Sequence, residues 1–159
     1  MTIRSVPWVA LVCGALVCCT ADTSLTEIVV TVDSDIDALD HIVVTTDNFG
    51  AEPLSSSGNF GPDQPGLPRS IGLVHDGGPL GPVAISVRAL DVDDKTLVVR
   101  HAKVFFVRHE VRLLRLELTR NCKRVYGSCN SDQTCVDGEC VADEGNLEPW
   151  TGAVPAAWL

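Results

Sequence analysis

The stretch from Cys122 to Cys140, Cys-Lys-Arg-Val-Tyr-Gly-Ser-Cys-Asn-Ser-Asp-Gln-Thr-Cys-Val-Asp-Gly-Glu-Cys, places four cysteines within nineteen residues. Six, five and four residues separate successive cysteines, and no histidine lies near them. Zinc sites usually start from cysteine pairs with two to four residues between the two cysteines. Only the last pair here has this spacing. We therefore interpret the four cysteines as disulfide-bonded, which requires an oxidising compartment.

The dipeptide Asp137-Gly138 predicts a tight hairpin turn, because glycine accepts the positive φ that a two-residue turn demands. Val136 then pairs with Glu139, and Cys135 faces Cys140 on the two stems. A bond between these two facing cysteines would close a very short loop and would constrain the unfolded chain little.

Disulfides that reach back to Cys122 and Cys129 close longer loops, worth about 3 kcal/mol for roughly fifteen residues. We therefore favour the pairing Cys122–Cys135 and Cys129–Cys140. The nested alternative, Cys122–Cys140 with Cys129–Cys135, stays open, because four cysteines permit three pairings.

The N-terminus has the features of an export signal. Arg4 is the only charged residue before Asp22, and the run from Val6 to Val17 is apolar apart from small residues. This run is shorter than the roughly 18–20 residues that span a bilayer, but it suits the apolar core of a signal peptide.

The end of this run, Leu16-Val17-Cys18-Cys19-Thr20, resembles the lipobox of bacterial lipoproteins. Leu16 and Val17 match its first two positions and Cys19 matches the acylated cysteine, while Cys18 stands where Gly, Ala or Ser is usual. The resemblance implies cleavage before Cys19 and attachment to the membrane through acyl chains, which bind almost irreversibly when several are present. Thr20, in place of Asp, implies sorting to the outer membrane.

The alternative is an ordinary secretory cut near Ala21, which would release a periplasmic or extracellular protein. Under the lipobox reading, cleavage removes Cys13 and Cys18 and acylation occupies Cys19, so the four C-terminal cysteines remain as an even set. Loss of Arg4 with the leader changes the formal charge from −9 to −10. So acidic a chain repels phosphate backbones, and we expect no nucleic-acid partner.

Residues 26–120 predict an all-β domain, an antiparallel two-sheet, immunoglobulin-like sandwich. The cleanest alternation places Val83, Ile85, Val87 and Ala89 inward and Ser86 and Arg88 outward. Six strands are expected: 26–32, 41–46, 70–74, 83–90, 96–107 and 112–118.

Two segments of this domain allow more than one interpretation. Residues 104–118 also have apolar residues at helical spacing, but the run Val104-Phe-Phe-Val107 favours a strand followed by a hairpin near Arg108. The connection 48–69 is rich in Gly, Pro and Ser and exceeds the usual loop length. It is a binding loop, a seventh strand near Asn59-Phe60, or a mobile segment, and its prolines argue against a central strand.

A leader, a Val-rich β domain and the segment Gln-Thr-Cys-Val-Asp-Gly-Glu-Cys, Gln133 to Cys140, together resemble small uncharacterised bacterial surface lipoproteins. That group has no settled activity, so the resemblance implies a location and an architecture and not a reaction. The expected organisation is a signal peptide over 1–18, a tether over 19–25, the sandwich over 26–120, a disulfide module over 121–141 and an acidic tail with Pro and Trp over 142–159.

Carboxylates in two predicted turns are candidate calcium ligands, since alternate acidic residues can surround a hard cation. The EF-hand pattern fails, because Ala38 stands where Gly is needed and Val44 where Glu is needed. A solvated turn is the competing explanation. The candidate ligands are Asp33, Asp35, Asp37, Asp91 and Asp93.

The sequence contains no nucleophile elbow, phosphate loop or His-Glu-x-x-His motif. We therefore expect a non-catalytic envelope protein without a cofactor, held to the membrane through Cys19 and bound to another envelope protein or a polysaccharide. The alternative is a calcium-dependent binding module or a hydrolase that uses the loop carboxylates.

Overall fold

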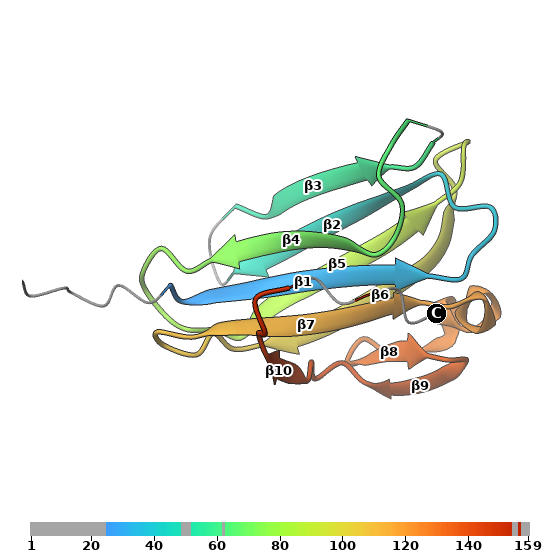
Figure 1. Ribbon diagram of the computed structural model, residues 1–159. Helices are drawn as coiled ribbons and strands as arrows, with labels where there is room; N and C mark the ends of the chain where they lie inside the picture. The colour runs from blue at the N-terminus through green and yellow to red at the C-terminus, as the bar shows by residue number, and fades with distance from the viewer. Residues whose placement is uncertain (1–24, 49–51, 62, 154–155, 157–159) are drawn as a thin grey trace, which may run out of the picture.

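The computed structural model describes residues 25–48, 52–61, 63–153 and 156, which form two four-stranded sheets and a separate hairpin (Figure 1). The first sheet has, in spatial order, β10 (Leu147–Pro149), β7 (Val111–Leu118), β1 (Glu27–Ser34) and β4 (Arg69–Val74). The second has β3 (Leu54–Asn59), β2 (His41–Asn48), β5 (Val83–Leu90) and β6 (Thr96–Val104).

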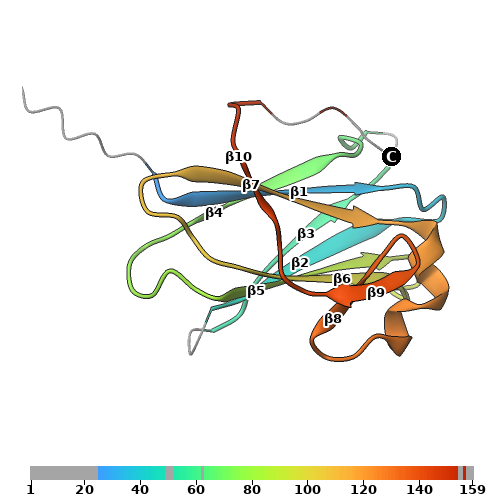
Figure 2. The ribbon, with the colours of Figure 1, turned by 90° about the horizontal axis from the view of Figure 1, so that it is seen from below.

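The two sheets pack face to face as a sandwich, which confirms the predicted fold class (Figure 2). Neighbouring strands are antiparallel except β1 and β7, which run parallel. All six predicted strands are present, and six of their twelve predicted ends coincide with those observed.

The core follows the alternation of apolar residues along each central strand. On β5, Val83, Ile85, Val87 and Ala89 are buried, as expected, while Arg88 is exposed. The same inner layer receives Ile28, Val30 and Val32 from β1, and Leu114, Leu116 and Leu118 from β7. Full burial of a branched aliphatic side chain contributes about 1.5–3 kcal/mol, so these strands supply most of the driving force for folding.

The helical alternative for residues 104–118 is wrong. The segment comprises the end of β6, a turn that contains His109 at a φ of 59°, and β7. The predicted fifth strand ends three residues early, at Val104, because the N–H of Phe106 donates to the carbonyl of Leu80 in a loop, 2.7 Å away, and not to a neighbouring strand.

The long connection after β2 contains β3, an edge strand that pairs only with β2. This is the seventh strand that the sequence allowed, although it lies before Phe60. Its side chains, mostly serines, are nearly all exposed. Pro65 and Pro68 follow in the irregular segment that leads to β4, as their missing N–H groups favour.

After β7 the chain forms two short 3-10 helices, η1 (Arg120–Arg124) and η2 (Tyr126–Ser128), and the hairpin of β8 (Gln133–Val136) and β9 (Glu139–Ala142). We call residues 120–142 the module. The tail then returns to the sandwich, where β10 pairs with β7 through Leu147 opposite Leu114.

Candidate functional site

Two disulfides fasten the module, with the pairing that the sequence favoured. Cys122 is bonded to Cys135 and Cys129 to Cys140, so the nested alternative is excluded. Cys135 and Cys140 face each other across the hairpin, as predicted. At the turn, Asp137 and Gly138 have φ values of 46° and 89°, the two positive angles that a tight hairpin turn requires.

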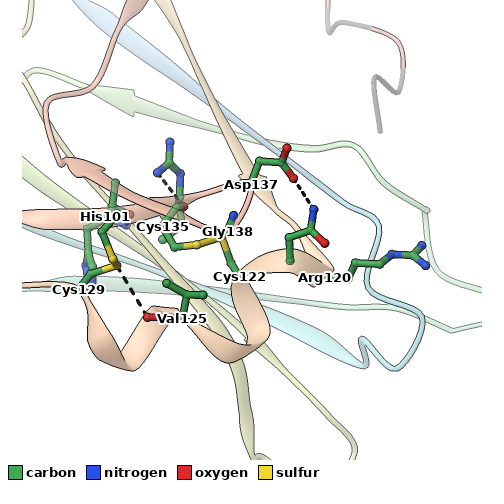
Figure 3. Close-up of a disulfide and its surroundings, with 12 residues drawn as sticks. His101, Arg120, Cys122, Val125, Cys129, Cys135, Asp137 and Gly138 are labelled. Carbon is green, nitrogen blue, oxygen red and sulfur yellow. Dashed lines mark hydrogen bonds between the residues drawn. A yellow bond between two sulfur atoms is a disulfide. The ribbon is translucent and has the colours of Figure 1, made fainter.

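The two disulfides differ in burial. Cys122 and Cys135 are each 1 % exposed and belong to the hydrophobic core of the sandwich. Figure 3 shows this bond beside the turn at Asp137, where the N–H of Gly138 points at the sulfur of Cys122, 3.4 Å away. Cys129 and Cys140 are only half-buried. The inner disulfide is therefore an extension of the core, whereas the outer one is a surface bond.

The module and the first residues of the tail cover the outer edge of β6. The N–H of Lys103 donates to the carbonyl of Asp143 (2.6 Å), and the N–H of Gly145 donates to the carbonyl of Lys103 (2.8 Å). Two residues earlier on β6, the N–H of His101 donates to the Thr134 hydroxyl (2.9 Å). An uncovered edge strand presents unpaired N–H and C=O groups, and these bonds satisfy those of β6.

A groove of about 350 Å³ lies between the module and the outer face of the second sheet. Its floor is made by outward-facing residues of β2, β5 and β6, and its wall by the loop that follows η2. The polar residues that line it are Thr45, Asp47, Ser86, His101, Lys103, Asn130, Ser131, Gln133 and Asp143. Hydroxyls and amides predominate, so the groove suits a ligand that forms many hydrogen bonds.

An ion pair forms part of the lining of the groove. Lys103 Nζ lies 3.0 Å from Asp143 Oδ2, and the Asp143 carboxylate is buried. Partial burial lowers the pKa of His101 below its ordinary value of 6.5; Asp143 opposes this shift, and Arg100 and Lys103 reinforce it. His101 is therefore mostly a neutral hydrogen-bonding group at neutral pH.

The candidate calcium ligands do not converge. The Asp35 carboxylate accepts hydrogen bonds from the backbone N–H and the Nε of Arg120 (2.7 and 3.0 Å), so it is already paired. Asp33 is buried and bonded to the N–H of Ser34. Asp91 accepts the N–H groups of Asp93 and Lys95, which stabilises its own turn.

Within residues 25–48, 52–61, 63–153 and 156, no group of three or more His, Cys, Asp or Glu side chains is placed to hold a metal ion. Asp37 is exposed in the loop between β1 and β2. The calcium interpretation thus receives no support from these contacts. The predicted lipid attachment residue, Cys19, and the predicted signal peptide lie outside the described residues. In the part of the chain that is described, none of the helices has the length and apolar character to cross a bilayer.

Sequence reasoning did not identify the groove. Thr45, Ser86 and Gln133 belong to three strands, and Asp143 was assigned to the tail. Each is an ordinary polar residue in its local sequence. The pairing of β2 with β5 places Thr45 beside Ser86, and the contacts of the module and the tail with β6 add Gln133 and Asp143.

No family model matches the chain, and a search of curated proteins finds no significant match. The fold and the two disulfides are therefore the basis for assigning a function. Disulfides are compatible with an extracellular or periplasmic location, where thiols are not kept reduced.

Proposed function

We propose that this chain is an exported, lipid-anchored envelope protein that acts as a binding module and not as an enzyme. Cleavage before Cys19 and acylation of that residue would hold it on the outer membrane. The observation that carries the proposal is the pairing of all four cysteines of the module in two disulfides, one of them within the core. A fold that depends on such bonds is stable only in an oxidising compartment.

The groove beside the module supports the binding role. It offers hydroxyl, amide and imidazole groups on a rigid floor of three paired strands, and its wall is fixed by the Cys129–Cys140 bond. Binding sites placed on rigid elements lose little conformational entropy when a ligand arrives. The partner is another envelope protein or a polysaccharide, recognised through hydrogen bonds.

Mass spectrometry of the native protein tests export and anchoring. The expected mass corresponds to a chain that begins at Cys19, carries acyl groups and contains two disulfides. A protein with an intact leader and free thiols would contradict export, and a chain cut near Ala21 without acyl groups would contradict anchoring alone.

Photo-crosslinking on whole cells tests the binding role. A crosslinking amino acid at Ser86, in the groove, is compared with one at Ser55, an exposed position on the same sheet in edge strand β3. We expect Ser86 to capture a discrete protein or a high-mass polysaccharide that Ser55 does not capture. Equal capture from both positions, or capture from neither, would contradict the groove as the binding site.

A further inference from the structure

Large exposed hydrophobic side chains gather at one end of the sandwich. We define the proximal end as the end where β1 begins and β4 and β6 finish, at the left of Figure 1. Leu54 is 72 % exposed, Val74 and Phe105 are 57 % exposed, and Leu25 is 55 % exposed. We call these four side chains the apolar rim.

Two other large hydrophobic residues of the described segments are exposed, Val92 at 79 % and Val141 at 38 %, and they lie elsewhere. Val92, in the turn between β5 and β6, is at the opposite end of the sandwich, and Val141 is on β9. Isolated exposed hydrophobic residues are common on protein surfaces and need no explanation. Four at one end of a small domain form a surface patch, which indicates an interaction.

A hollow of about 380 Å³ lies beside part of the apolar rim. Leu54 and Val74 line it, and Val83 and Phe106 make an apolar floor. The Phe106 ring packs on His75, with the ring centroids 5.2 Å apart. The floor of the hollow is thus fixed by packing.

Phe105 is held outward by its neighbours. Gly81 lies against it at a φ of 140°, and a Cβ added there would stand 3.1 Å from Phe105 Cα and 2.8 Å from the carbonyl oxygen of Val104. Only glycine permits this close approach of the loop. The backbone conformation of the proximal end therefore keeps Phe105 exposed.

The position of the chain end indicates what covers this patch. Residues 1–24 join the described structure at Leu25, within the apolar rim, and the predicted acylated residue, Cys19, is six residues upstream. Six extended residues span at most about 20 Å, at roughly 3.3–3.6 Å each. An acyl chain on Cys19 would therefore hold the proximal end close to the membrane, within one short tether length.

We propose that the apolar rim rests on the phospholipid bilayer, so that the protein is attached by its acyl chains and oriented by Leu25, Leu54, Val74 and Phe105. This inference rests on the proposed acylation of Cys19. Amphipathic surfaces of this kind insert shallowly at the boundary between headgroups and acyl chains. The orientation leaves the module, at the other end of β7, directed away from the membrane.

Charges near the apolar rim have both signs, so the contact is predicted to depend on apolar burial. Arg112 pairs with Glu110 at 2.6 Å, and exposed Asp76 lies on the wall of the hollow. A contact without a dominant charge should persist at high salt, because screening weakens only electrostatic attraction.

Hydroxyl-radical footprinting of the acylated protein tests this orientation. The protein is reconstituted in phosphatidylethanolamine–phosphatidylglycerol vesicles, and oxidation of each side chain is measured by mass spectrometry. The reference is the mature Cys19→Ser protein mixed with the same vesicles. We expect oxidation of Leu54 and Phe105 to fall by about threefold or more, since insertion at the interface excludes water, while oxidation of Val92 stays unchanged, at low and at high salt.

Two acylated variants complete the test. Leu54→Asp with Phe105→Asp should still float with the vesicles but should restore oxidation of Leu25 and Val74 to the solution level, whereas Val92→Asp should leave their protection intact. All three substituted side chains are exposed, so folding is retained and circular dichroism verifies it. Flotation with equal oxidation of the apolar rim and Val92 overturns the orientation while acylation stands. Absence of acyl mass on Cys19 overturns the anchoring, and the orientation with it.

Discussion

The two long sides of the sandwich are closed in different ways. On one side, the module covers β6 and places Cys122 and Cys135 in the core, and the tail strand β10 pairs with β7. On the other side, β3 and β4 lie next to each other in different sheets (Figure 1), and a narrow groove of about 110 Å³, lined in part by Ser56, Ser57 and Arg69, runs between them. We call these the closed side and the open side.

The difference shows how this chain compensates for limited core volume. Aromatic residues make up only 5 % of the sequence, so few large side chains are available to fill the gap between two curved sheets. On the closed side a disulfide replaces them, combining a small apolar contact with a constraint on the unfolded chain. The open side has no such covalent bond in the described residues, its two edge strands are six residues long, and β3 is largely polar.

Among the changes that test the difference between the closed side and the open side, removal of the inner disulfide should have the largest effect on stability. We expect Cys122→Ala with Cys135→Ala to lower the free energy of unfolding by about 3–5 kcal/mol, because loop-closure entropy and buried core contacts are lost together. Urea unfolding of the oxidised protein measures this change.

The outer disulfide is the matched control. Its loop is nearly as long, with a sequence separation of 11 compared with 13, but Cys129 and Cys140 are only half-buried. We therefore expect Cys129→Ala with Cys140→Ala to cost less, about 2–3 kcal/mol. An equal or larger loss would show that the inner bond is not part of the core.

A glycine on each side gives a second comparison. A Cβ at Gly145, on the closed side, would stand 2.5 Å from Val104 Cγ1 and 3.2 Å from Leu114 Cδ1, whereas one at Gly58, on β3, meets only Ile42 at 3.8 Å. We expect Gly145→Ala to lower the free energy of unfolding by about 2 kcal/mol through overpacking. Gly58→Ala should change it by less than about 1 kcal/mol, and in the stabilising direction. Thermal unfolding of both variants distinguishes these outcomes, and similar values for the two would contradict the packing difference.

Much of the fold could be predicted from the sequence, because its signals are local. Alternation along 83–90 gave the inward and outward faces of β5, and Asp137-Gly138 gave the register of the hairpin and thus the facing cysteines. The order and pairing of the strands in the two sheets could not be predicted from the sequence. Nothing local indicates that β1 pairs in parallel with β7, more than eighty residues away, or that the tail contributes β10.

Within the candidate site, only the disulfide-bonded cysteines could be predicted, because their residue type is visible in the sequence. Spacing and loop length favoured the observed cysteine pairing but left the nested alternative open. The groove did not, because His101, Gln133 and Asp143 acquire their relation only when the module packs on β6. The loop aspartates are of the residue type that binds calcium. In the structure, however, Asp35 forms an ion pair and Asp91 accepts a hydrogen bond within its own turn. The sequence does not reveal these contacts.

Two buried threonines give a third comparison, based on hydrogen bonds. Thr134, on the closed side, accepts the N–H of His101, and Thr31, towards the open side, shares a hydrogen bond of 2.7 Å with exposed Ser70. We expect Thr134→Val to lower the free energy of unfolding by about 1 kcal/mol, since it removes the acceptor of a covered backbone N–H. Thr31→Val should cost less, because water can solvate the Ser70 hydroxyl. Urea unfolding measures both, and a larger loss for Thr31→Val would contradict the comparison.

The smallest expected effect is a pH dependence of the closed side that comes from His101. The pKa of His101 is lowered in the folded protein, chiefly by burial, so the unfolded chain binds more protons in the window just below the ordinary pKa of 6.5. Stability should therefore fall as pH decreases through this window, and the loss should stop below the folded-state pKa.

The variant His101→Gln retains a hydrogen-bonding side chain without this titration. The difference in unfolding free energy between the variant and the original protein should change in favour of the variant as pH falls below 6.5, and it should be constant above about pH 8, where both states of His101 are neutral. The effect is small because His101 remains partly exposed, so water screens its charge. Comparison of urea unfolding at several pH values measures it. A difference that does not vary with pH, or that changes in the opposite direction, would show that the module does not desolvate His101, and that the groove is open to water in solution.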